Sequence, residues 1–164
     1  DVHGTLVSWI EDRHKNRGRL CGITSGLADL DRITDGVQEG ELCVIGARPG
    51  LGKSSAGLEI IRAACEHRPD VAFYLYTRSW RIPELRAAIG RRLLRVPNLT
   101  VWASTDPTTG PAPRGGRDAG IFPDHDAARA AGRPVCPEQT GQFEACGKCG
   151  ACWSTLKNVA FLAH

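Results

Sequence analysis

A short segment in the first half of the chain carries the residue types that bind phosphate groups. Its nine consecutive residues are Ala47, Arg48, Pro49, Gly50, Leu51, Gly52, Lys53, Ser54 and Ser55. In a phosphate-binding loop, backbone N–H groups and the positive end of the following helix surround the anion, and glycine lets the backbone come close. We therefore expect Lys53 to reach the β and γ phosphates of a nucleotide and Ser54 to bind the magnesium ion that bridges them.

The loop departs from the pattern G-x-x-x-x-G-K-[ST] at one position, because Ala47 stands where the first glycine belongs. The alternative interpretation is an ordinary glycine-rich turn. An apolar run over residues 42–45 precedes the loop and a helical pattern follows it, which is the order that nucleotide phosphate binding requires.

Four of the seven cysteines lie close together near the end of the chain, namely Cys136, Cys146, Cys149 and Cys152. Thiolates are soft ligands that select iron–sulfur clusters or zinc. The C-x-x-C-x-x-C triplet with a remote Cys-Pro favours an iron–sulfur cluster, whereas Zn²⁺ would accept the same four sulfurs in tetrahedral geometry. We expect Phe143 and Trp153 to shield the site from water. Disulfides are the alternative, and a cytosolic location disfavours them.

The composition is that of a soluble globular protein, with 41% hydrophobic and 24% charged residues among 164. No run of about 18 apolar residues and no signal-peptide pattern is present, so we expect a cytoplasmic protein without a membrane partner. The three scattered cysteines, Cys21, Cys43 and Cys65, are predicted to be small core residues.

Positive charge gathers after the phosphate loop. Residues 1–70 hold nine Lys/Arg and eleven Asp/Glu, whereas residues 71–164 hold twelve and seven. Six arginines fall between positions 78 and 95, namely Arg78, Arg81, Arg86, Arg91, Arg92 and Arg95. They would either face a nucleic-acid backbone or form a solvated helix face.

Hydrophobic periodicity predicts strands that alternate with helices. The expected strands cover residues 41–46, 71–76, 99–103 and 159–162, and the expected helices cover residues 5–17, 27–33, 53–67, 83–96 and 124–131. The apolar run 71–76 is typical of a strand buried on both faces. The pattern predicts an α/β fold, with a mainly parallel sheet flanked by helices. We divide the chain into an N-terminal helix and linker (1–21), a phosphate-loop core (22–104) and a loop-rich segment with the four cysteines (105–164).

Residues 5–61 resemble the motor domain of DnaB-type replicative helicases. The resemblance is carried by the segment 22–31 (GITSGLADLD), by Gly36 and by the phosphate loop. That family also has an alanine ahead of Arg-Pro in this loop, which accounts for Ala47. The resemblance implies a RecA-like fold, ATP and Mg²⁺ as cofactors, a hexameric ring and single-stranded DNA as the partner.

The residues expected to support hydrolysis are missing or displaced. In that family, the strand after the phosphate-loop helix ends in a glutamate that orients the attacking water, but here Thr77 and Arg78 follow Tyr76. Asp106 is the only candidate for the magnesium-binding aspartate and is poorly placed. The DNA-contacting loops and the arginine finger have no visible counterpart. We therefore expect ATP binding with impaired hydrolysis.

From about residue 62 onward, the chain instead resembles the gene product 88 family of actinobacteriophages. The matching stretches are residues 73–80 and 102–106, together with Cys136-Pro137-Glu138 and the cysteine triplet. The sequence thus reads as a mosaic of two families. The alternative function is a phage iron–sulfur or zinc protein in which the phosphate loop is a relic, and a mosaic without independent activity is a third interpretation.

Overall fold

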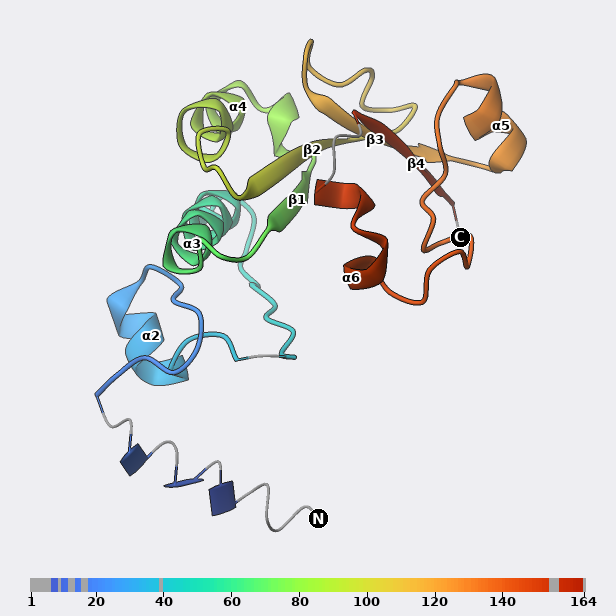
Figure 1. Ribbon diagram of the computed structural model, residues 1–164. Coiled ribbons are helices and arrows are strands. Elements are labelled where there is room, and N and C mark those ends of the chain that lie inside the picture. Colours follow the sequence, from blue (N-terminus) through green and yellow to red (C-terminus); the bar gives the residue numbers. More distant parts are fainter. Residues whose placement is uncertain are drawn as a thin grey trace. The chain divides into compact units, whose positions relative to one another are not determined.

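The computed structural model describes residues 7–8, 10–11, 14–15, 18–38, 40–153 and 157–163 (Figure 1). The chain divides into two compact units, Asp1–Arg68 and Pro69–His164, and the division falls inside the predicted core 22–104. Of the helix predicted over residues 5–17, the described residues 7–8, 10–11 and 14–15 are helical, and the rest lies outside the described residues. No helix among the described residues is long and apolar enough to cross a membrane.

The first unit contains a closed loop, residues 22–38, which includes helix α2 (Ala28–Thr34). Ile23 and Val37 form an isolated antiparallel bridge, with N–H···O distances of 2.9 Å in both directions. Beside this bridge the backbones of Gly22 and Gly36 are in close contact, because a Cβ on Gly36 would lie 2.8 Å from the carbonyl carbon of Gly22. Both positions therefore require glycine.

The Asp31 carboxylate ties this loop together. It accepts hydrogen bonds from the Ser25 N–H at 2.8 Å, the Ser25 hydroxyl at 2.6 Å and the Thr24 hydroxyl at 2.5 Å. Desolvation acts to raise the pKa of Asp31, but the hydrogen bonds from Ser25 and Thr24 outweigh it and the pKa is lowered. The ionised carboxylate therefore stabilises the part of the chain in which the helicase resemblance begins.

Helix α3 (Lys53–His67) starts at the predicted residue and directly follows the phosphate loop. Leu58 and Cys65 of its predicted inner face are buried. The helix also passes close to Gly26, where an added Cβ would lie 2.6 Å from the Cβ of Ala63. This contact joins α3 to the closed loop of the same unit.

The strand predicted over residues 41–46 is not formed. Residues 41–48 have no regular secondary structure, and the side chains of Leu42 and Val44 are 88% and 80% exposed. A strand is stable only when a neighbouring strand accepts its backbone hydrogen bonds, and none of the described strands pairs with this segment. The core assignment of Cys43 is consequently wrong, as is that of Cys21, because both are exposed, whereas Cys65 is buried as predicted.

The second unit is built on a parallel sheet with the order β1-β2-β3-β4 (Figure 1). Its strands are β1 (Phe73–Thr77), β2 (Leu99–Thr105), β3 (Arg117–Phe122) and β4 (Asn158–Leu162). The predicted α/β fold with a parallel sheet and flanking helices is confirmed. Strand β3 falls in a stretch for which the sequence predicts no regular structure.

Strand β1 lies at an edge of this sheet, where its described partner is β2 alone. The prediction that this run is buried on both faces is therefore wrong, and the side chain of Tyr74 is 38% exposed. Aromatic packing stabilises one face of this edge strand. The rings of Tyr74 and Tyr76 meet edge to face with centroids 5.6 Å apart.

Short helices cover the two faces of the sheet. They are η1 (Ser79–Arg81), α4 (Pro83–Ala88), the π-helical turn η2 (Ile89–Leu93), α5 (His125–Ala130), α6 (Cys146–Cys149) and η3 (Ala151–Trp153). Helix α5 begins as predicted at Asp124, whose carboxylate accepts the Ala127 N–H at 2.8 Å. Because successive residues of β2 point to opposite faces, Val101 lies towards η2 and Trp102 packs with Cys136 on the other side.

Candidate functional site

The backbone of the phosphate loop in the first unit turns at two glycines. Gly50 and Gly52 have φ angles of 83° and 81°, which residues other than glycine rarely adopt. A Cβ at either position would meet nothing within 4 Å, so glycine is required here by backbone conformation and not by crowding. The two turns bring residues 47–52 around the start of α3.

Lys53 crosses the mouth of this loop. Its ammonium group donates hydrogen bonds to the carbonyl oxygens of Ala47 at 2.9 Å and Arg48 at 3.2 Å. The first turn of α3 contains no acidic residue and receives no side-chain cap. The uncapped start of α3 and the Lys53 charge thus belong to one short segment, as in an anion-binding loop.

The end of β1 in the second unit carries no carboxylate. Its last residue, Thr77, accepts the Ser79 N–H at 3.0 Å. Arg78 is paired with Asp106 at 2.6 Å, and Asp106 also accepts the Thr108 N–H at 2.8 Å and its hydroxyl at 2.6 Å. These hydrogen bonds from Thr108, and then the Arg78 charge, lower the pKa of Asp106. The Asp106 carboxylate oxygens thus stabilise the turn after β2 through these contacts.

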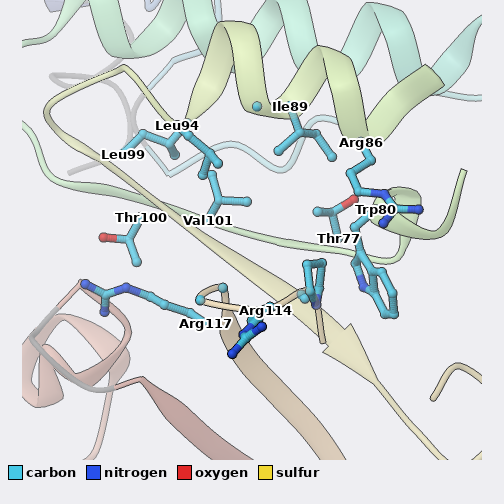
Figure 2. A pocket seen from close by; sticks show the side chains of 15 residues that line it. Thr77, Trp80, Arg86, Ile89, Leu94, Leu99, Thr100, Val101, Arg114 and Arg117 are labelled. Atoms are coloured by element: carbon cyan, nitrogen blue, oxygen red, sulfur yellow. The ribbon is translucent and has the colours of Figure 1, made fainter. Parts of the chain in front are cut away.

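A pocket of about 380 Å³ lies on the α4 face of β2 (Figure 2). Figure 2 shows Ile89 and Leu94 on one side of it and Arg114 and Arg117 on the other. The connection from β2 to β3 contains no helix, which leaves this part of the face uncovered. It presents two arginines, Arg86 and Arg114, and no acidic residue, a lining suited to an anion with an apolar body. The guanidinium of Arg117 lies 5.4 Å from the ring centroid of Trp102, its register partner, and so belongs to the cysteine face.

The four clustered cysteines lie on the opposite face of the sheet, where Cys136 and Cys152 line one small cavity. Cys136 is buried, Cys149 and Cys152 are half-buried, Cys146 is exposed, and the four form no disulfide. Burial raises the pKa of the Cys152 thiol, and the charges of the other three cysteines raise it further. Within the described residues, no three histidine, cysteine or acidic side chains are grouped as a ready metal site.

Aromatic side chains surround these cysteines on the sheet side. The Tyr76 hydroxyl donates to Cys152 Sγ at 2.9 Å, and the Trp102 indole N–H donates to the Cys152 carbonyl oxygen at 2.7 Å. The ring of Trp153 stacks on that of Tyr74 with centroids 5.2 Å apart. Phe143 is 40% exposed, so the aromatic cover comes mainly from β1 and β2.

The comparison with protein families matches one segment of the chain. Residues 22–86 match the DnaB-like helicase C terminal domain. The match thus extends beyond the predicted limit at residue 61, through β1 and into α4.

Individual replicative helicases are similar to part of the chain. DnaB of Treponema pallidum is 43% identical over 70 residues, which are 42% of this chain and 16% of that protein. DnaB of Leifsonia xyli is 40% identical over 52 residues, and DnaC of Bacillus subtilis is 41% identical over 51 residues. The chain covers 11% of each of these two proteins. A solved structure, the ATPase domain of G40P, has a TM-score of 0.46 and 15% identity, covering 99% of this chain and 70% of that one.

Proposed function

We propose that the phosphate loop, residues 47–55, binds the triphosphate of ATP with Mg²⁺, and that hydrolysis is impaired. The observation that carries this proposal is that the uncapped start of α3 follows two left-handed glycines and bears Lys53, whose ammonium reaches the carbonyl oxygens of Ala47 and Arg48. The similarity of residues 22–86 to a replicative helicase domain supports ATP as the ligand. Lys53 would exchange its two carbonyl partners for phosphate oxygens, and Ser54 would bind Mg²⁺.

The proposed impairment of hydrolysis rests on the resemblance to replicative helicases, in which the strand after the phosphate-loop helix ends in a glutamate that orients the attacking water. A general base or a water-orienting group must carry a carboxylate or amide close to the attacking water. In this chain β1 ends in Thr77 and Arg78, and Asp106 is already engaged by Arg78 and Thr108. We therefore propose a protein that holds ATP and turns it over slowly. By the same resemblance, we propose single-stranded DNA as partner, a hexamer as assembly and the cytoplasm as location.

Titration of a fluorescent ATP analogue against the whole chain tests the binding. Lys53→Ala removes a charge-assisted phosphate contact worth about 2–3 kcal/mol, so we expect an affinity loss of about a hundredfold. Ser54→Ala should remove the part of the affinity that depends on added Mg²⁺. Lys157→Ala, an exposed lysine of the second unit, is the matched control and should leave the affinity unchanged.

Equal affinity for wild type and Lys53→Ala would refute ATP binding at this loop and would make the loop a relic of its helicase-like ancestor. Phosphate release is measured on the same samples. We expect a rate no higher than that of Lys53→Ala, because the attacking water lacks an orienting group. Sustained ATP hydrolysis by the wild type that Lys53→Ala abolishes would support the binding site but refute the proposed impairment of hydrolysis.

A further inference from the structure

Two of the four clustered cysteines are held firmly against the sheet. Cys136 is 5% exposed, belongs to the core cluster around Trp102, and donates its N–H to the Ala160 carbonyl at 2.8 Å. Cys152 is held through its carbonyl oxygen by Trp102 and through its sulfur by Tyr76. Both cysteines line one small cavity of about 10 Å³. Cys136 and Cys152 thus form a fixed pair.

The other two cysteines lie on a segment that has little to lose by moving. Cys146 and Cys149 are the first and last residues of α6, a single helical turn without a buried side chain. Gly147 lies inside this turn, and Gly150 ends it with a φ of 66°. The Tyr74 hydroxyl already makes a hydrogen bond with Cys146. A shift of this turn towards the fixed pair would break no core contact of α6.

A metal ion would draw the four thiols together as thiolates, and each thiol would release its proton to solvent on ligation. Soft thiolates select zinc or an iron–sulfur cluster, and either accepts four sulfurs.

We propose that Cys136, Cys146, Cys149 and Cys152 bind one thiolate-ligated metal centre, a zinc ion or an iron–sulfur cluster, on the face of the sheet opposite the arginine-lined pocket. Tyr76 is its positioning residue, since its hydroxyl is a hydrogen-bond donor to the Cys152 sulfur at 2.9 Å. Donors of this kind fix the orientation of a ligand and tune the metal it holds. The centre would join the C-terminal segment to β1 and β2, independently of the phosphate loop.

The test uses the whole chain, prepared without oxygen and supplied in one arm with Zn²⁺ and in the other with Fe²⁺ and sulfide. One zinc per chain with proton release, or iron with broad visible absorption, would support the site and identify its metal. Cys149→Ser should weaken binding by about a hundredfold or more, because it removes one of four ligands. Cys43→Ser changes an exposed cysteine outside the cluster and should bind metal like the wild type.

Metal binding in neither arm, or equal binding by Cys149→Ser and Cys43→Ser, would overturn the site. Cys136→Ser is avoided as the main variant because this side chain belongs to the core, and far-UV circular dichroism checks that Cys149→Ser is folded. Tyr76→Phe should lower the metal affinity by about 10- to 100-fold. Unchanged affinity in Tyr76→Phe would remove the positioning role while leaving the four ligands in place.

Discussion

Substitution of Trp102 tests how the sheet holds the cysteine segment. Its side chain is fully buried, and its indole N–H donates to the Cys152 carbonyl oxygen at 2.7 Å. Trp102→Phe keeps an aromatic ring but removes this donor. The Cys152 carbonyl oxygen then loses its hydrogen bond, which costs about 1–3 kcal/mol of stability. The smaller ring leaves a cavity that adds about 1 kcal/mol. We expect the second unit to lose about 2–4 kcal/mol of its free energy of unfolding.

Trp80→Phe is the matched control for this substitution. It makes the same chemical change at a half-buried side chain, whose indole N–H donates to the Ser104 carbonyl oxygen at 3.2 Å. Amide hydrogen exchange, followed by mass spectrometry on peptides from β2, reports on this unit alone. The expected loss corresponds to exchange about 30- to 700-fold faster for Trp102→Phe and a smaller change for Trp80→Phe.

The same samples report on the position of Cys152. Alkylation of its thiol should accelerate in Trp102→Phe and stay at the wild-type rate in Trp80→Phe, because only the first substitution releases the backbone of Cys152. Equal exchange in the two variants, or an unchanged alkylation rate at Cys152, would refute the idea that this indole anchors the cysteine segment.

Two further predictions concern the closed loop of the first unit. Gly36→Ala should destabilise residues 22–38 by about 2–4 kcal/mol, because it adds a backbone clash to the strain of a φ of 78°. Gly40→Ala, with a φ of 79° and open space around it, should cost only about 1 kcal/mol. Equal amide exchange rates in the two variants would contradict this prediction. Because the folded pKa of Asp31 lies below its ordinary value of 3.8, its stabilising contribution is present above about pH 4 and is lost as the pH falls through the folded pKa. Amide exchange over residues 22–38, corrected for its intrinsic pH dependence, should therefore rise on acidification in the wild type but not in Asp31→Asn, and an identical pH profile in both would count against the carboxylate's role.

Elements with a local signal in the sequence were predictable. Helix α3 has a glycine-rich start and a helical apolar pattern, and α5 has its cap at Asp124, so neither depends on distant residues. The pairing of strands, in contrast, depends on residues that are distant in the sequence. The apolar segment 41–46 has no described partner, whereas β3 contains Arg117, Asp118 and Gly120 and becomes a strand because β2 and β4 pair with it on both sides.

The candidate sites divide in the same way. The phosphate loop is contiguous, so the sequence alone indicates its candidate residues, and nucleotide binding by them stays a prediction. The contact of Tyr76 with Cys152 spans 76 residues and belongs to the folded sheet, and no pattern in the sequence indicates it. The arginine-lined pocket is likewise assembled from α4, β2 and the turn before β3. The resemblance of residues 62–164 to gene product 88 stays a prediction.

The alternation of side chains along β2 has a consequence for how reliably the sheet assembles. Val101 faces the arginine-lined pocket, and the next residue, Trp102, faces the cysteines. If β2 slipped by one residue against β1, every side chain would change faces. The indole would then fill the pocket and lose its bond to the cysteine segment, while a valine would replace it beside Cys136. A shift of one residue would thus destabilise the packing on both faces of the sheet at once. The sequence of β2 therefore strongly favours a single register.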